Sequence, residues 1–199
     1  MDRRDLLKLI ATATGTSFIC SPAMAVWQEQ PALTSVKDSG LDDNTVALIT
    51  ELCETVLPRT DTPGAKDAGL PAFFIGMIRE CYTPEQQALM EAGFKDVDAR
   101  SQEEYGKPFI GLSQKQKTAL ASKLDSEALA FNRGEDSPWD GKEDGLPHYF
   151  TLYKQLMIFG FFTSKTGGTQ VLRHVDIPGD YKDIPYKKGD KAWMTVWPV

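Results

Sequence analysis

Residues 48–74 (LITELCETVLPRTDTPGAKDAGLPAFF) constrain the fold most, because two apolar helical patterns flank a segment that cannot be helical. Spacings of i, i+3, i+4 and i+7 predict a helix whose inner face carries Ile49, Leu52, Cys53 and Val56. Pro58 ends this helix, because proline lacks an N–H and pushes the preceding residue out of the α region. Residues 59–64 (RTDTPG) are typical of a polar turn. A second helix is predicted from Pro71, with Phe74, Met77, Ile78 and Cys81 facing inward.

Two further helices are marked by capping boxes, in which a Ser or Thr and a Gln three residues later bond each other's backbone N–H. The first is Thr83–Gln86, with Pro84 at the first helical position, and its helix is expected to run to about Tyr105. Its inner residues are Leu89, Met90, Phe94 and Val97, and residues 106–108 (GKP) close it. The second is Ser113–Gln116, and its helix aligns Leu120, Leu124, Ala128 and Phe131.

Residues 147–162 (PHYFTLYKQLMIFGFF) form the most apolar segment after the first 25 residues. A helix that is apolar nearly all round is buried on most sides, so this segment is either a central core helix or a helix partly covered by another chain. Residues 132–145, which precede it, are polar and acidic and predict a surface loop that contains Trp139.

After this helix, residues 163–168 (TSKTGG) predict a turn, and residues from about 169 form a tail without helical period and with little strand length. The tail contains Trp193 and Trp197, which suggests that it docks on this domain or on a partner. The expected fold is therefore mainly α: a single small helical domain of about five helices with an irregular, aromatic C-terminal tail.

The first 25 residues are typical of a twin-arginine signal peptide. Arg3 and Arg4 are followed by Leu6, Leu7 and Lys8, then by a moderately apolar run, and Ala23 and Ala25 form a small-x-small cleavage site. The run is shorter than the ~20 residues of a membrane-spanning helix. The weaker alternatives are an ordinary amphipathic helix and a lipid anchor on Cys20. Residues 26–41 are expected to be an extended leader and 42–199 the helical domain.

The twin-arginine translocase carries folded proteins, so this chain is expected in the periplasm, with a cofactor of its own or with a partner that has one. Removal of 25 of the 199 residues leaves 174, which suit one domain with a core, and changes the formal charge from −6 to −7. This acidity argues against a nucleic-acid partner, which needs a clustered basic surface.

No catalytic or cofactor motif is recognisable. The chain has no GxGxxG after a strand, no phosphate-binding loop, no CxxCH and no four-cysteine set. His148 and His174 could share a metal ion, and Glu54 and Asp61 could form an acid–base pair, but solvated or capping roles are the commoner use of such residues. Cys53 and Cys81 either pair as a disulfide in an oxidising compartment or remain buried free thiols.

Two blocks, ETVLPRTDTPGA (residues 54–65) and FGFFTSKTGGTQVLRHVDIPGDY (residues 159–181), resemble the gluconate 2-dehydrogenase subunit 3 family. The resemblance implies a non-catalytic small subunit, exported by the twin-arginine route, with no cofactor of its own. Its partner would be a large FAD-dependent dehydrogenase of the glucose–methanol–choline type, often with a cytochrome c subunit that carries haem c and anchors the complex.

The resemblance also assigns roles in fold and interface, rather than in catalysis, to the positions that match its motifs. These are Pro58, Thr60, Asp61, Pro63, Gly64, Phe161, Thr163, Ser164, Gly167 and Gly168. The competing hypothesis is a self-sufficient periplasmic enzyme or ligand-binding protein with an unrecognised site.

Overall fold

The computed structural model describes Val36 and residues 39–133, 145–175, 179–180, 183, 185 and 187–194. The chain divides into two units, Met1–Leu33 and Thr34–Val199, and every described residue belongs to the second. The predicted signal peptide, most of the predicted leader, Trp139 and Trp197 lie outside the described residues.

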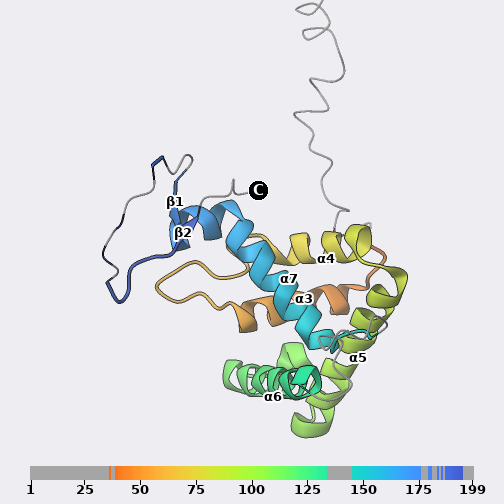
Figure 1. The fold of residues 1–199 in the computed structure, drawn as a ribbon. Coiled ribbons are helices and arrows are strands. Elements are labelled where there is room, and N and C mark those ends of the chain that lie inside the picture. Colours follow the sequence, from red (N-terminus) through yellow and green to blue (C-terminus); the bar gives the residue numbers. More distant parts are fainter. Residues whose placement is uncertain are drawn as a thin grey trace, which may run out of the picture. The chain divides into compact units, whose positions relative to one another are not determined.

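The described part is mainly helical, as the sequence predicts (Figure 1). Its α-helices are α3 (Asp43–Val56), α4 (Leu70–Cys81), α5 (Pro84–Tyr105), α6 (Gln114–Arg133) and α7 (Tyr149–Thr163). A 3₁₀ turn, η2 (Phe109–Gly111), precedes α6, and a π-helical segment, η4 (Gly167–Val171), follows α7. Two short strands, β1 (Arg173–His174) and β2 (Trp193–Met194), pair in parallel.

The helix boundaries follow from local chemistry. Asp42 caps α3 by accepting a hydrogen bond from the backbone N–H of Thr45, and α3 ends one residue before Leu57, as Pro58 requires. The capping box of α5 is formed by Thr83 and Gln86. Both reciprocal bonds are also present between Ser113 and Gln116 at the start of α6.

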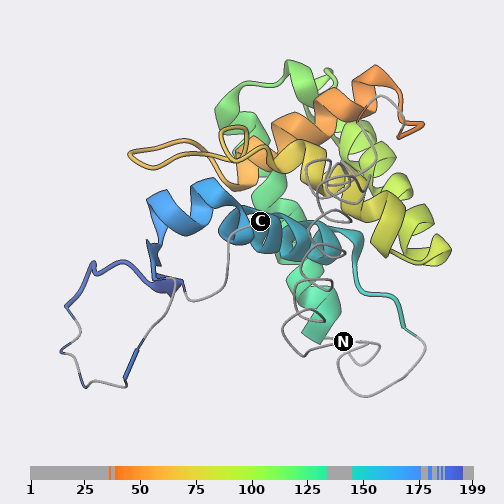
Figure 2. The ribbon, with the colours of Figure 1, turned by 90° about the horizontal axis from the view of Figure 1, so that it is seen from above.

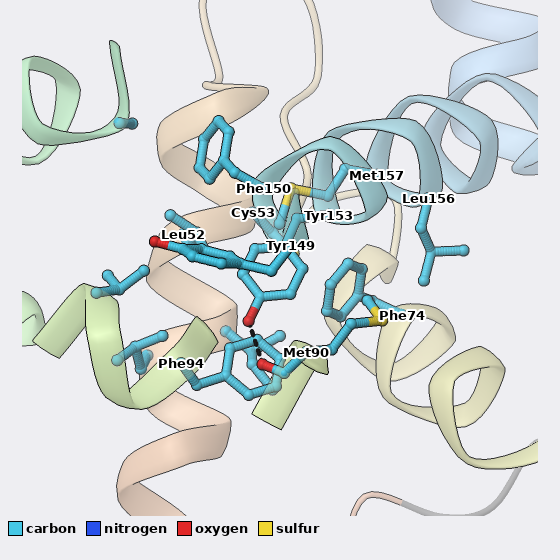
Figure 3. Close-up of a cluster of buried hydrophobic side chains, with 14 of the residues drawn as sticks. Leu52, Cys53, Phe74, Met90, Phe94, Tyr149, Phe150, Tyr153, Leu156 and Met157 are labelled. Atoms are coloured by element: carbon cyan, nitrogen blue, oxygen red, sulfur yellow. Dashed lines mark hydrogen bonds between the residues drawn. The ribbon is translucent and has the colours of Figure 1, made fainter. Parts of the chain in front are cut away.

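The core is organised around α7, which packs against α3, α4, α5 and α6 (Figures 1 and 3). Tyr153 is fully buried at its centre and stacks on Phe94, with ring centroids 4.8 Å apart. The ring of Phe74 meets Tyr153 edge-on at 5.8 Å, and the Tyr153 hydroxyl donates to the backbone carbonyl of Met90. Of the two alternatives for this segment, α7 is a central core helix, and it leaves Ile158 and Phe159 exposed on one side.

Two inward-facing predictions are wrong. Cys81 is the last residue of α4 and is exposed, and Phe131, in the last turn of α6, is 43% exposed. Both lie in the last turn of their helix, and helical periodicity reports the direction of a side chain rather than whether another element covers it. Cys53 is buried while Cys81 is exposed, and both are free thiols, so the predicted alternative of a Cys53–Cys81 disulfide is not present.

The predicted turn over residues 163–168 is also wrong in detail, because helical structure resumes directly after Ser164. Gly167 makes this possible: a Cβ added there would lie 1.9 Å from the carbonyl oxygen of Phe161, so only glycine fits. The tail likewise has an element that its sequence does not reveal. Arg173 N donates to Ala192 O at 2.9 Å, and Met194 is buried.

Candidate functional site

The loop between α3 and α4, residues 57–69, contains most of the first sequence block. Glu54, in the last turn of α3, fixes the position of this loop by hydrogen bonds. The carboxylate of Glu54 accepts hydrogen bonds from the backbone N–H of Arg59 at 3.0 Å and of Lys66 at 2.9 Å. Leu57 O also accepts from Ala65 N at 2.9 Å. Because the first and last parts of the loop are both hydrogen-bonded to the end of α3, these two parts are held close together. Glu54 is thus occupied as an acceptor, not paired with Asp61.

A second carboxylate, Asp67, fixes the loop from its far side. Asp67 accepts from the backbone N–H of Gly64 at 2.9 Å and from Arg59 Nε at 2.7 Å, and the Arg59 Nη2 also pairs with it. Gly64 is required at this point, because an added Cβ would lie 2.5 Å from Arg59 N and 2.6 Å from Glu54 Oε1. Arg59 and Asp67 were not singled out from the sequence.

The tip of the loop consists of Thr60 and Asp61, which are exposed, and Thr62, which is half-buried. Thr60 N donates to Thr62 O at 3.0 Å, which makes the tip a tight turn. The Thr60 hydroxyl donates to Asp61 Oδ1 at 3.0 Å. Pro58 is exposed beside the end of α3, and Pro63 is partly buried beneath the tip.

The two sequence blocks meet in space. A polar pocket of about 350 Å³ is lined by Arg59, Thr60, Asp61, Thr62, Pro63 and Asp67 from the loop and by Thr166 and Gln170 from the segment after α7. Thr166 Oγ1 donates to Asp67 O at 3.5 Å, across 99 residues of chain. Figure 2 shows the loop lying beside the last turns of the helical segment that follows α7. We refer to this site as the loop pocket.

The other positions of the second block build the end of α7. Phe161 is buried in the core. The Ser164 hydroxyl donates to Phe161 O at 2.6 Å and accepts from Gly167 N at 3.0 Å, and Gly168 N donates to Ser164 O at 2.8 Å. Thr163 Oγ1 donates to Phe159 O at 2.7 Å. These residues shape the backbone that carries Thr166 to the loop pocket.

Beneath the loop, Glu51 ties it to α6. The carboxylate of Glu51 accepts from Lys66 Nζ at 2.6 Å and from Lys117 Nζ at 2.7 Å. The hydrogen bond from the buried Lys117, followed by that from Lys66, lowers the pKa of Glu51 below its ordinary value of 4.5.

An apolar patch lies on the outer side of α7 and consists of Ile158, Phe159 and Phe73. Phe159 is 55% exposed and Ile158 is 40% exposed. Phe73 of α4 is partly buried, and its ring centroid lies 6.3 Å from that of Phe159. We refer to these residues as the α7 patch.

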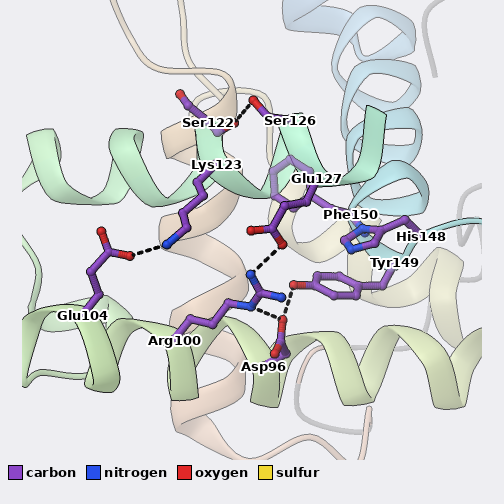
Figure 4. Close-up of polar contacts among 10 residues, drawn as sticks. All are labelled: Asp96, Arg100, Glu104, Ser122, Lys123, Ser126, Glu127, His148, Tyr149 and Phe150. Atoms are coloured by element: carbon purple, nitrogen blue, oxygen red, sulfur yellow. Dashed lines mark hydrogen bonds and ion pairs between the residues drawn. The ribbon is translucent and has the colours of Figure 1, made fainter. Parts of the chain in front are cut away.

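At the start of α7, a polar network joins three helices (Figure 4). Arg100 of α5 bonds Asp96 at 2.7 Å and Glu127 of α6 at 2.6 Å, while the Tyr149 hydroxyl donates to Asp96 at 2.5 Å. Burial, followed by the bond to Asp96, raises the pKa of Tyr149. This network is a structural connection between helices.

The two histidines are not brought together. His148 caps α7, with its Nδ1 accepting from Phe150 N at 3.2 Å, and burial lowers its pKa. His174 lies in β1, beyond the opposite end of α7 (Figure 1). The 15 residues of α7 span about 22 Å at 1.5 Å per residue, so His148 and His174 do not share a metal ion, the less common alternative in the sequence analysis.

Within the described ranges, no group of three or more His, Cys, Asp or Glu side chains is arranged to hold a metal ion. In the same ranges, none of the helices combines the length and apolarity needed to cross a membrane.

Several structurally important residues lack a local signal in the sequence. Gly160 has no side chain, and this leaves space for the ring of Phe73 to pack against α7. Lys117 Nζ donates a hydrogen bond to Glu51, which lies 66 residues away along the chain. A small residue inside the aromatic run FGFF is the one sign that another helix approaches at Gly160.

Comparison with known protein families matches residues 43–179 to gluconate 2-dehydrogenase subunit 3. No curated protein and no solved structure matches the chain. The matched region includes α3 to α7, the loop pocket and almost all of the second sequence block. The chain therefore belongs to the gluconate 2-dehydrogenase subunit 3 family.

Proposed function

We propose that this protein is the non-catalytic small subunit of a periplasmic, flavin-dependent dehydrogenase of the glucose–methanol–choline type that oxidises a sugar, polyol or sugar acid. The observation that carries the proposal is the family match over residues 43–179, because the family is named as a subunit of gluconate 2-dehydrogenase. FAD then belongs to the large subunit, and haem c to a cytochrome c subunit that joins the complex.

The predicted signal peptide, residues 1–25, gives the small subunit its second role. Arg3 and Arg4 precede an apolar run and a cleavage site, the pattern that the twin-arginine translocase recognises. Because that route carries folded proteins, a small subunit with the signal escorts a folded large subunit that has none. The complex is then periplasmic.

The α7 patch supports a subunit role. Aromatic residues are enriched at protein interfaces, and Phe159 and Ile158 leave apolar surface exposed on the helix that is otherwise the centre of the core. The patch is small compared with the ~800 Å² that each partner buries in a standard interface, so it would be the apolar part of a larger contact.

Affinity purification of the chain from the periplasm of its native host tests this proposal. A larger flavoprotein should co-purify, with flavin absorption and acceptor-dependent dehydrogenase activity that disappear when the small subunit is deleted. A colourless chain that is soluble and stable alone would contradict the proposal, and activity in that single chain would establish the self-sufficient enzyme instead.

The Phe159→Ser variant extends this test to the α7 patch. It should fold normally, since the side chain is largely exposed, but retain less flavoprotein. Leu129→Ser, at an exposed apolar position on α6 outside the α7 patch, is the matched control and should retain the wild-type amount.

A further inference from the structure

The loop pocket contains a carboxylate that the fold itself does not use. Three of the acidic residues around the loop are engaged: Glu51 by Lys66 and Lys117, Glu54 by two backbone N–H groups, and Asp67 by Arg59 and Gly64. Among the described residues, Asp61 receives a single hydrogen bond, from the hydroxyl of its neighbour Thr60. Its charge is therefore free to meet a partner.

The charge of the loop pocket is set by Asp61. Arg59 is the one cationic residue in the lining, and it is neutralised by its paired bonds to Asp67. The remaining polar groups are the hydroxyls of Thr60, Thr62 and Thr166 and the amide of Gln170. Hydroxyl and amide oxygens accept hydrogen bonds, and a carboxylate is an acceptor only, so the lining suits a donor that carries positive charge.

The loop pocket is also fixed in shape before any partner binds. Glu54 and Asp67 bond the loop on both sides, Gly64 closes it, and Thr166 joins it to the segment after α7. A preformed site loses less conformational entropy on binding than a mobile loop would.

We propose that the loop pocket receives a lysine or arginine side chain of the large subunit, with Asp61 as its counter-ion. The ammonium or guanidinium group donates to Asp61 and to the threonine hydroxyls, and the volume of about 350 Å³ leaves room for the head group and retained water. This inference rests on the proposed function, and it adds the point at which electrostatics orient the two subunits.

Asp61→Asn tests the inference in the complex of the full chain with the flavoprotein that co-purifies. Glu103→Gln is the matched control, because it removes the same charge from an exposed position on α5 outside the loop pocket. At low salt, Asp61→Asn should raise the Kd of the complex about tenfold, and the difference should shrink as salt is raised. Glu103→Gln should leave the Kd unchanged, and both variants should keep the wild-type Tm.

A second measurement identifies the partner's group. Treatment of the complex with a carbodiimide should join the Asp61 carboxylate to a lysine of the large subunit, detected by mass spectrometry. If the group is an arginine, the crosslink is absent, and replacing that arginine by glutamate should weaken the wild-type complex and be rescued by Asp61→Lys.

Three outcomes would overturn the inference or its basis. Equal Kd values and salt dependence for wild type and Asp61→Asn would overturn the inference while leaving the proposed function intact. Equal weakening by Asp61→Asn and Glu103→Gln would show a general charge effect and would also overturn it. Absence of a flavoprotein from the wild-type preparation would overturn the proposed function, and the inference with it.

Discussion

Gly160 of α7 lies directly against the ring of Phe73 of α4: a Cβ added to Gly160 would lie 2.5 Å from Cδ1 and Cε1 of that ring. It would also lie 2.8 Å from Cδ1 of Leu70. This contact lets α4 and α7 approach closely and places Phe73 beside Phe159 at the surface. Packing in the core thus determines the position of the α7 patch.

Gly160→Ala should therefore destabilise the protein, although alanine favours helix more than glycine does. Overpacking costs about 1–3 kcal/mol and the helix preference returns up to about 1 kcal/mol, so the free energy of unfolding should fall by about 1–2 kcal/mol. Urea denaturation measures it. Gly111→Ala is the control, since the nearest atom to its added Cβ is 3.9 Å away. Equal stability of the two variants would contradict the packing argument.

Glu54→Gln should loosen the loop between α3 and α4. The carboxylate accepts from two backbone N–H groups, and an amide can offer only one oxygen, so one N–H loses its acceptor. We expect the free energy of unfolding to fall by about 1–2 kcal/mol and backbone hydrogen exchange at Arg59 or Lys66 to accelerate. Glu103→Gln, at an exposed site on α5, should change neither quantity.

The stability of the protein should depend on pH through Glu51. Because its pKa is lowered in the folded state by Lys117 and Lys66, Glu51 contributes stability that is fully present above its ordinary pKa of 4.5. That stability is lost as pH falls through the lower folded pKa. Glu51→Gln should therefore flatten the fall in unfolding free energy below about pH 4.5. Glu103→Gln should keep the wild-type slope, and an unchanged slope in Glu51→Gln would refute the assignment.

The two cysteines of the helical domain should differ in reactivity. Cys81 is exposed and should react with a thiol reagent in the native protein. The experiment uses the Cys20→Ser variant, so that Cys53 and Cys81 are the thiols counted. Burial raises the pKa of the Cys53 thiol, so Cys53 should react only on unfolding. Counting modified thiols by mass spectrometry before and after denaturation checks this. Absence of any reactive thiol in the denatured, unreduced chain would show a disulfide instead.

Features set by neighbouring residues could be predicted from the sequence. Thr83 with Gln86 and Ser113 with Gln116 each form a capping box within one helical turn, so the starts of α5 and α6 were predictable. Pro58 likewise ends α3, whatever surrounds it. The apolar run of α7 predicts its central place, because few polar side chains remain to face water.

Features that depend on distant residues could not be predicted in this way. The loop pocket needs Thr166 beside Asp67, and the π-helical segment needs Gly167 against Phe161. Helical periodicity placed Cys81 inside because it reports the direction of a side chain, not whether another element covers that direction. The exposure of Phe159 could not be predicted for the same reason: α7 is apolar nearly all round, so its sequence does not show which side no other element covers.

The measurement that tests the central claim most directly is the location of the flavoprotein when the signal of this chain is changed. With the wild-type signal peptide, a flavin-containing dehydrogenase should appear in the periplasm together with this protein. Changing both Arg3 and Arg4 to lysine should leave both proteins in the cytoplasm, with the flavoprotein itself unaltered. Normal export of the flavoprotein in that variant would contradict the account of this chain as its escort.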